Sequence, residues 1–565
     1  MVPRTHLPAH FTAAFLILAA FGCGGPTPAR QTGPTESPGQ PAPTAANTQT
    51  TNVEPQPGDW LVENLGAEPA LLNPILDLVD AGGRYICSRI FDTLIDLDNE
   101  TLEFIPNIAE KWEISDDHLV YTFYLRKDAV YSDGVPVTAH DVKFTYDLIK
   151  NPAVDAAAAR SYFVDVQSAE LVDDYTIRFT CVKPYFRHIL TLGALEPIPR
   201  HVYGQGDFNR HPNNRHPIGS GPYKFEKWET GQQISLVRNE RYWGPKPMLD
   251  RHVLKIITDD NASFQVLERH EIDIMQMQPE MWKRRASTPQ FEREFAKLTP
   301  QSPIPGYLSR FGYIGWNMRK PQFEDKRVRR ALTMLLDRQT ILDRIYMGLG
   351  TLISGDCFPG EPEYNPNVKP LPFAPQEAVK LLEQAGWIDA DRDGVREKNG
   401  VPFTFELSYA ADIPEYDRMA TVYQEELTRA GIKMSPRPLE WAVFQERVQK
   451  RTFDACMLAW LTTPLYDPYQ LWHSSQAEEG SNYPGFKNAE ADAIMENARV
   501  EFDRAKRVEM YHRFHEILDE EQPYTFLFSR NGLIALDKRF QNVQVYPLGL
   551  DPLEWWVPAE LRRYK

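Results

Sequence analysis

The 565-residue chain lacks the features that mark several large classes of protein. It has no long run of lysine and arginine, and its 78 acidic residues outnumber its 62 basic ones. It therefore has no basic stripe of the kind that nucleic-acid binding requires. Only one long apolar run occurs, close to the N-terminus, so no second membrane-spanning segment is predicted. The acidic balance suits a soluble protein.

Recognisable catalytic motifs are also missing. No G-x-S-x-G, H-E-x-x-H or P-loop motif occurs, and the glycine-bearing segment 348–355 is not followed by the lysine of a P-loop. A hydrolase would need a nucleophile held against a base, and nothing in the sequence indicates one. We expect no enzymatic activity and no cofactor.

Two segments match metal-binding loops only in part. Residues 389–394 spell D-x-D-x-D-G, the opening of a calcium loop, but the twelfth position is Gly400 where a glutamate is needed. His211 and His216 lie in one loop without a companion cysteine. We predict no metal site.

The N-terminus has the pattern of an export signal. The apolar run 11–21 is too short for a stable membrane anchor and is typical of a signal peptide, predicted over residues 1–22. The run ends at Gly22-Cys23, which resembles a lipobox, the site where cleavage exposes a cysteine for lipidation. Bulky Phe21 is an imperfect match, so ordinary cleavage to a soluble protein is the alternative.

The segment after Cys23 is rich in Pro, Thr, Gln, Ala and Gly and has almost no large apolar residues. Such a segment cannot bury a core, so residues 23–58 are predicted to be a disordered tether behind the lipidated cysteine. The expected location is extracytoplasmic, on a membrane. The other cysteines, predicted to be buried free thiols, are Cys87, Cys181, Cys357 and Cys456.

From Trp60 onward, short strand patterns alternate with helical ones. Residues 121–126 and 176–182 alternate apolar and polar side chains as half-buried strands do. Thr138 is a candidate N-cap for a helix, residues 325–346 form an amphipathic helix pair, and residues 375–387 begin with proline as helices often do. This mixture predicts an α/β protein.

Six blocks after residue 60 resemble, in order, the signature segments of the family 5 extracytoplasmic solute-binding proteins. The second reads AEKWEISDDHLVYTFYLRKDAVYSDGVPVTAHDVKFTYD and the third includes PIGSGPYKFEKW. In the third, Gly219 and Gly221 are expected to allow the backbone angles of a tight crossover. The blocks are residues 66–77 with 90–98, 109–147, 217–250, 316–332, 381–400 and 453–468.

The resemblance implies a two-lobed periplasmic-binding-protein fold, type II-like, with an extra inserted subdomain and a ligand cleft between hinged lobes. The implied ranges are lobe I at 59–315, its inserted subdomain at about 95–210, lobe II at 316–527, and a C-terminal return to lobe I at 528–565.

The implied function is the substrate-binding component of an ABC importer, which captures a peptide-like or other medium-sized organic solute and delivers it to permease subunits. A monomer is expected. The alternatives are a non-peptide ligand, such as an oligosaccharide, an anionic metabolite or a metal chelate, or a chaperone or signalling lipoprotein on the same fold.

Candidate ligand-binding residues follow from the last block and its surroundings. Aromatic side chains that border a cleft can pack on an organic ligand, and Trp460 matches a family tryptophan that does so. The resemblance places the other candidates near the same cleft. The full set is Trp460, Thr462, Thr463, Tyr466, Asp467, Trp316, Asn317, Trp441, Tyr483 and Tyr162.

One position departs from the peptide-binding members. Their block reads Trp-x-x-Asp, and the Asp pairs with the peptide's α-ammonium, whereas Thr463 stands there in this chain. Asp467 matches the following Asp-Pro pair instead. Because a buried ammonium needs a partner, free-amino peptides are predicted not to be the preferred ligand.

Overall fold

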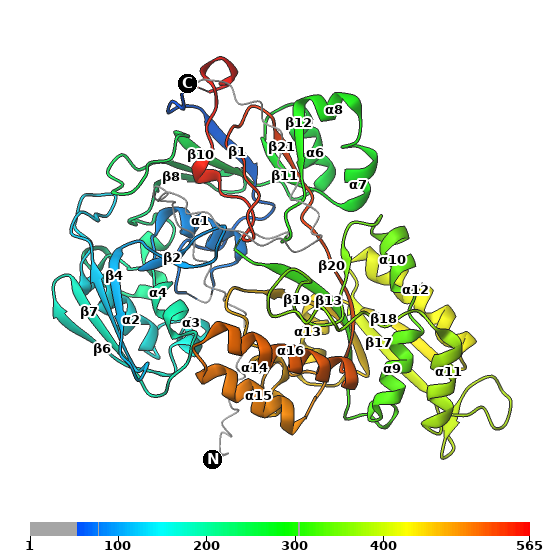
Figure 1. Cartoon of the computed structure of the whole chain (residues 1–565). Helices are drawn as coiled ribbons and strands as arrows, with labels where there is room; N and C mark the ends of the chain where they lie inside the picture. The colour runs from blue at the N-terminus through cyan, green and yellow to red at the C-terminus, as the bar shows by residue number, and fades with distance from the viewer. Residues whose placement is uncertain (1–53, 77, 303–305, 565) are drawn as a thin grey trace, which may run out of the picture. The chain divides into compact units, whose positions relative to one another are not determined.

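The computed structural model describes residues 54–76, 78–302 and 306–564, and its contacts divide the chain into two units (Figure 1). Each unit is built from discontinuous stretches. Unit 1 comprises the chain up to Met275, Leu536–Gln544 and Asp551–Lys565; unit 2 comprises Gln276–Ala535 and Val545–Leu550.

Unit 1 contains two larger sheets. The part of the first sheet that belongs to unit 1 runs β11-β1-β10-β9-β8, in which β1 pairs in parallel with β10 and β11 while β9 is antiparallel to both its neighbours. The second, antiparallel sheet runs β4-β5-β7-β6 and is covered by α2 (Figure 1).

The strands of unit 1 are β1 (Trp60–Asn64), β2 (Ile95–Leu97), β3 (Phe104–Pro106), β4 (Ala109–Ile114), β5 (Val120–Leu125), β6 (Val166–Asp173), β7 (Thr176–Cys181), β8 (Tyr223–Glu229), β9 (Gln233–Arg238), β10 (Arg251–Lys255) and β11 (Ile274–Gln276), the last ending in unit 2. Its helices are α1 (Ala81–Ile90), α2 (Ala139–Lys150), α3 (Ala157–Tyr162), α4 (His188–Gly193), α5 (Arg200–Tyr203) and α6 (Asp260–Glu268).

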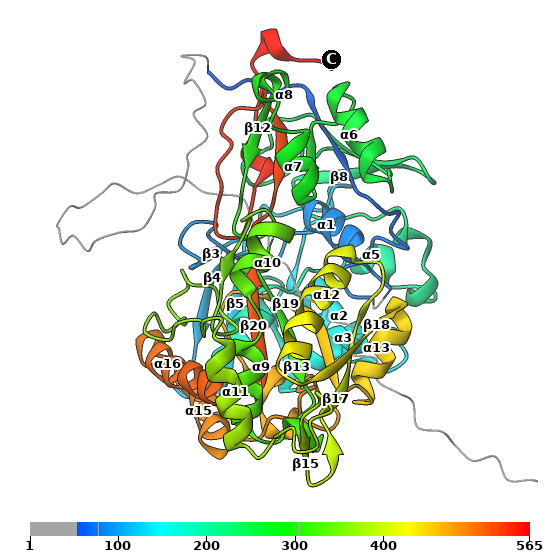
Figure 2. The ribbon, with the colours of Figure 1, turned by 90° about the vertical axis from the view of Figure 1, so that its right-hand side faces the viewer.

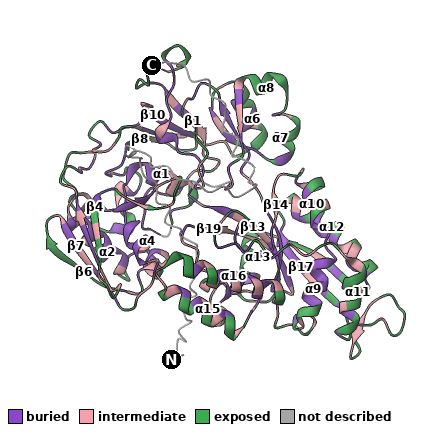
Figure 3. Ribbon diagram, viewed as in Figure 1, coloured by how far each residue is buried: buried purple, intermediate pink, exposed green. Residues whose placement is uncertain are grey.

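Unit 2 is organised around a sheet of order β14-β20-β13-β19-β17-β18. One face packs with α9 to α12 around Trp316, Leu332 and Tyr423, and the other packs with α14 to α16 around Trp472 and Phe514. Figure 2 shows the first helical layer, and Figure 3 shows that the sheet between the layers is mostly buried.

The strands of unit 2 are β12 (Phe295–Leu298), β13 (Ser309–Trp316), β14 (Thr351–Leu352), β15 (Glu397–Lys398), β16 (Val401–Pro402), β17 (Thr404–Ala410), β18 (Lys433–Leu439), β19 (Ala455–Thr462), β20 (Tyr524–Ser529) and β21 (Ile534–Asp537), the last ending in unit 1. Its helices are α7 (Pro279–Arg284), α8 (Pro289–Glu294), α9 (Lys326–Met334), α10 (Arg338–Ile345), α11 (Pro375–Gln384), α12 (Pro414–Arg429), α13 (Trp441–Gln449), α14 (Tyr469–Trp472), α15 (Ala489–Val500) and α16 (Arg504–Glu521).

Several local predictions are confirmed. The two alternating segments are β5 and β7, the predicted helix pair is α9 and α10, and α11 begins at Pro375. Thr138 is the N-cap of α2, where its backbone N–H and its hydroxyl both donate to the Asp141 carboxylate at 2.9 Å. Cys87, Cys181, Cys357 and Cys456 are free and buried.

Gly219 and Gly221 do not have the special backbone angles predicted for them. Neither residue has a positive φ. Instead, a Cβ at Gly219 would lie 2.1 Å from the Ile90 carbonyl oxygen, and the Gly221 N–H donates to that oxygen at 2.7 Å. The glycines are needed because this loop lies directly against the end of α1.

The unit boundary falls at 275/276, whereas the sequence places the first lobe boundary at 315/316. The two units are defined by which residues contact one another, and such a division does not locate a hinge. The predicted lobe ranges therefore stay a prediction. The predicted signal peptide, Cys23 and most of the tether lie outside the described residues. No helix in the described part of the chain is long and apolar enough to span a membrane.

Candidate ligand-binding site

Trp460 belongs to a row of parallel aromatic rings in unit 2. Its ring stacks on Tyr313 of β13 with centroids 6.5 Å apart and on Tyr483 with centroids 5.8 Å apart. Tyr313 stacks in turn on Tyr524 at 3.7 Å, and the Trp460 indole N–H donates to the Tyr524 hydroxyl at 3.4 Å. We call Tyr313, Trp460, Tyr483 and Tyr524 the aromatic ladder. Trp460 and Tyr483 remain partly exposed, whereas Tyr313 and Tyr524 are buried.

The two threonines after Trp460 differ in their surroundings. Thr462 is buried at the end of β19, and its hydroxyl hydrogen-bonds the Ser309 hydroxyl of β13 at 2.8 Å. Ser309 also donates to the Glu361 carboxylate at 3.3 Å. Thr462 therefore joins two strands, while Thr463 is only partly buried.

Tyr466 is engaged with a buried carboxylate. Its hydroxyl donates to both oxygens of Asp356 at 2.8 Å, and the Trp472 indole N–H donates to the same carboxylate at 2.6 Å. Burial raises the pKa of Asp356 to about 6, although these hydrogen bonds act to lower it. The arrangement fixes the loop after β19.

Asp467 forms an ion pair with an arginine of the same unit. Its carboxylate accepts from Arg499 of α15 at 2.8 Å and 2.9 Å, and its side chain is only 3% exposed. The Arg499 guanidinium also lies 3.6 Å from the centroid of the Tyr469 ring. The structure thus gives Asp467 a role in joining the β19–α14 loop to α15.

Trp316 and Asn317 lie in the core of unit 2. Trp316 is fully buried, and its indole N–H donates to the Thr525 hydroxyl at 3.2 Å. The Asn317 amide donates to the backbone carbonyls of Arg451 and Phe453 at 3.1 Å and 2.8 Å. Both side chains are buried in this structure, and a contact between them and a ligand stays a prediction.

The last two candidates belong to elements other than those that carry the aromatic ladder. Trp441 begins α13 and is 42% exposed. Tyr162 belongs to unit 1, where it lines a cavity of about 10 Å³ with Arg84 and Glu196, which form an ion pair at 3.3 Å. Burial raises the pKa of Glu196 to about 7 against the attraction of Arg84.

Tyr313 and Tyr524 are not among the residues predicted from the sequence. Both lie on strands whose aromatic side chains recur at every second residue, with Phe311 before Tyr313 and Phe526 after Tyr524. That alternation was available as a signal, because such residues share one face of a strand. Asp356 and Glu361 carry no comparable signal, since they lie in a loop.

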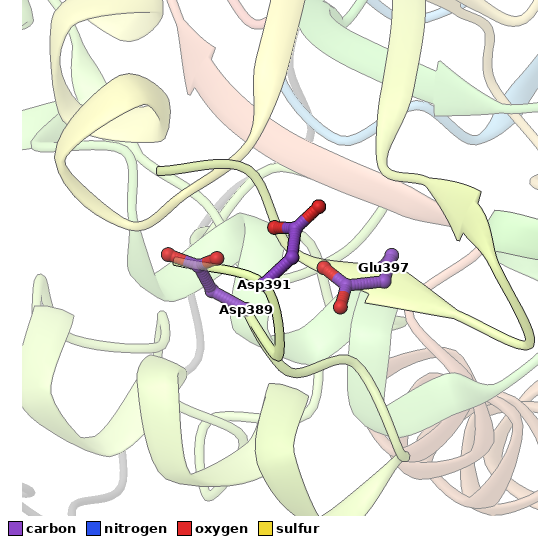
Figure 4. A group of neighbouring side chains, drawn as sticks. All are labelled: Asp389, Asp391 and Glu397. Atoms are coloured by element: carbon purple, nitrogen blue, oxygen red, sulfur yellow. The ribbon is translucent and has the colours of Figure 1, made fainter. Parts of the chain in front are cut away.

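The acidic turn near residue 390 brings three carboxylates together (Figure 4). One ligand atom from each of Asp389, Asp391 and Glu397 lies within 4.8 Å of the others. Backbone N–H groups of Gly394 and Ala390 donate to Asp389 and Glu397 at 3.1 Å and 2.8 Å. These bonds account for the shape of the turn.

Comparisons with known proteins agree on one family. A family model described as bacterial extracellular solute-binding proteins, family 5, matches residues 103–482. The chain is 30% identical to the oligopeptide-binding protein AppA of Bacillus subtilis, over 89% of this chain and 92% of AppA. It is 26% identical to the heme-binding protein A of Haemophilus influenzae, over 86% and 89% of the two chains.

Solved structures give the same architecture. The structure of AppA from Bacillus subtilis with a nonapeptide aligns with a TM-score of 0.74 and 29% identity, covering 89% of this chain and all of that one. NikA from Brucella suis in complex with Fe(III)-EDTA aligns with a TM-score of 0.77 and 24% identity, covering 88% of this chain and all of NikA. The second likeness concerns the fold alone.

Proposed function

We propose, from the premise that this chain belongs to family 5 of the bacterial extracellular solute-binding proteins, that it is the substrate-binding component of an ABC importer. The observation that carries the proposal is the 30% identity to an oligopeptide-binding protein across nearly the full length of both chains. The protein captures a peptide-like or other medium-sized organic solute by hinge closure and delivers it to permease subunits.

Native mass spectrometry of the purified protein tests this function. A co-purified small molecule, released on denaturation and able to rebind, supports solute capture. X-ray scattering should then show a more compact particle after that molecule is added back. Turnover of the molecule by the protein, with release of a changed product, would contradict the proposal and indicate an enzyme.

We further propose that the mature protein begins at a lipidated Cys23 and acts outside the cytoplasm. The apolar run 11–21, the Gly22-Cys23 junction and the following Pro- and Thr-rich segment support this. Cys23→Ser should move the protein from the membrane fraction to the soluble fraction, and Cys181→Ser is the matched control. An N-terminal peptide without acyl mass in the unsubstituted protein would contradict lipidation.

A ligand without a free ammonium is favoured within this function. Thr463 carries no charge, and Asp467 is bound to Arg499, so neither offers a free carboxylate next to Trp460. A modified peptide, an oligosaccharide or an anionic metabolite could bind next to these residues without leaving a buried ammonium unpaired.

A further inference from the structure

A small cavity lies on the α10–α12 side of the unit 2 sheet. It encloses about 20 Å³ between β13, β19 and β20 on one side and Tyr346, Tyr416 and Met419 on the other. Space is left above the sheet because Gly312 of β13 and Ala459 of β19 pair with each other and neither has a side chain larger than a methyl group. The space suits one or two water molecules, or the oxygen atoms of a carboxylate, rather than a whole solute.

Two arginines share this cavity. Arg310 is the second residue of β13, and Arg530 directly follows β20. The Arg530 guanidinium lies 5.0 Å from the centroid of the Tyr346 ring. Burial lowers the pKa of Arg310, Tyr416 acts to raise it, and neighbouring Arg530 lowers it further.

No described carboxylate forms an ion pair with either arginine. Glu415, which lies near Tyr346, accepts a hydrogen bond from Arg418 at 2.8 Å. Two guanidiniums that are partly withdrawn from water without an anion destabilise the fold, since desolvation of a charge is repaid only by a partner. An arginine fork matches the two oxygens of a carboxylate in geometry as well as in charge.

We propose that Arg310 and Arg530, with the Tyr416 hydroxyl, form a binding site for a carboxylate group. The site is distinct from the aromatic ladder, because side chains alternate along a strand. Phe311 pairs with Trp460 on one face of the sheet, whereas Gly312 pairs with Ala459 on the other. Trp460 and Arg310 nevertheless lie at the same end of the sheet, where β13 begins and β19 ends.

The inference rests on the proposed function and deepens it by naming one chemical group of the captured solute. A solute that lies across this end of the sheet could place an apolar part on Trp460 and a carboxylate between the arginines. A free carboxylate ion presents the same chemistry, so the two sources must be separated by experiment.

Calorimetric titration of the full chain with acetate, at constant ionic strength, tests the site without any need for the natural solute. Arg310→Met and Arg530→Met should each weaken acetate binding by about tenfold or more, because each removes a charge-assisted hydrogen bond. Gly312→Val should weaken it as strongly while leaving both charges in place. Arg429→Met, an exposed residue of α12 paired with Glu426, is the matched control and should bind acetate normally.

Thermal unfolding supplies a second readout. In the absence of acetate, Arg530→Met should melt at a higher temperature than the unsubstituted protein, because one of two uncompensated cations is gone. Acetate affinity unchanged in Gly312→Val, or lowered equally in Arg429→Met, would overturn the proposal. If either arginine variant fails to fold, Gly312→Val still decides the matter.

Native mass spectrometry separates the two sources. Loss of the co-purified solute in Gly312→Val assigns the carboxylate to that solute, while its retention together with weakened acetate binding assigns the site to a free carboxylate ion. If acetate binding follows the predicted pattern but the protein captures no organic solute, the carboxylate site is supported and the proposed function is contradicted.

Discussion

At the scale of single residues, Trp460 is the candidate with the clearest physical role. Its ring stacks on Tyr313 and Tyr483 in the aromatic ladder and remains partly exposed, so a ligand can pack only on the exposed part. Trp460→Ala should weaken solute binding by about 1–3 kcal/mol, measured by calorimetry with the co-purified solute. Phe373→Ala, at an exposed aromatic residue of unit 2 outside the candidate set, is the control. Equal affinities in the Trp460 variant and the unsubstituted protein would make Trp460 a purely structural residue.

Glu361 should make stability depend on pH. Burial, with Glu363 nearby, raises the pKa of Glu361 to about 8 from its ordinary value. The folded state therefore binds this proton more tightly, so the stabilisation is complete below about pH 4.5 and is lost as the pH rises through 8.

Glu361→Gln should accordingly remove part of the pH dependence of the free energy of unfolding. We expect the free energy of unfolding of the variant to match that of the unsubstituted protein near pH 4.5 and to exceed it by about 4 kcal/mol above pH 8, in denaturant unfolding followed by tryptophan fluorescence. Exposed Glu425→Gln is the matched control. A stability difference that does not change with pH would mean that Glu361 is ionised in the folded protein at neutral pH.

The position of a site residue could be predicted where a motif marks it. Whether its side chain reaches the site could not be predicted, because packing determines the direction of the side chain. Trp460 and Trp316 both stand in recognised blocks, yet one is partly exposed and the other is fully buried. Trp316 lies inside the core on the α9 to α12 side of the sheet, whereas Trp460 packs only partly against the core on the α14 to α16 side, and no single segment encodes that difference. Arg310 and Arg530 meet only because β13 and β20 pair, although more than two hundred residues separate them.

At the scale of elements, local signals were reliable because local physics decides them. Period-two strands and a proline-started helix formed where the sequence placed them, since alternation and capping act within a few residues. The role of Gly219 was misjudged because its constraint comes from Ile90, which is distant in sequence.

Gly219→Ala should therefore destabilise unit 1. The new Cβ would meet the Ile90 carbonyl oxygen at 2.1 Å, and backbone cannot rotate away as a side chain can. We expect a loss of about 1–3 kcal/mol in the free energy of unfolding, measured with denaturant. Gly82→Ala is the control, because its Cβ would meet the flexible end of Leu65 at 3.2 Å within α1. Equal stability of the two variants would contradict this account.

At the scale of the whole molecule, the family resemblance gave the two-lobed fold that the relatives share, while composition alone gave only a mixed α/β protein. The ligand was not predictable to the same degree. Relatives of similar overall identity are named for binding oligopeptides, dipeptides or heme. The common fold therefore does not determine the ligand, and we expect a few side chains around one end of a sheet to determine it.

Those side chains argue against peptides with a free N-terminus. An α-ammonium enclosed in a closed cleft loses several kcal/mol of hydration unless a carboxylate pairs with it. Thr463 offers a hydroxyl without charge, and the buried Asp467 carboxylate already forms an ion pair with Arg499. The remaining candidate near Ser309 is Glu361, and its raised pKa favours the neutral acid.

Calorimetry with peptides of two to nine residues, each with a free and an acetylated N-terminus, tests this prediction. We expect weak binding of the free forms and no loss of affinity on acetylation, because no carboxylate is available to the ammonium. Tight binding of the free forms that is lost on acetylation would contradict it. Glu361→Gln would then identify the acid: if it abolishes the preference, an ammonium holds Glu361 ionised in the complex, and if it does not, Asp467 has exchanged Arg499 for the ligand.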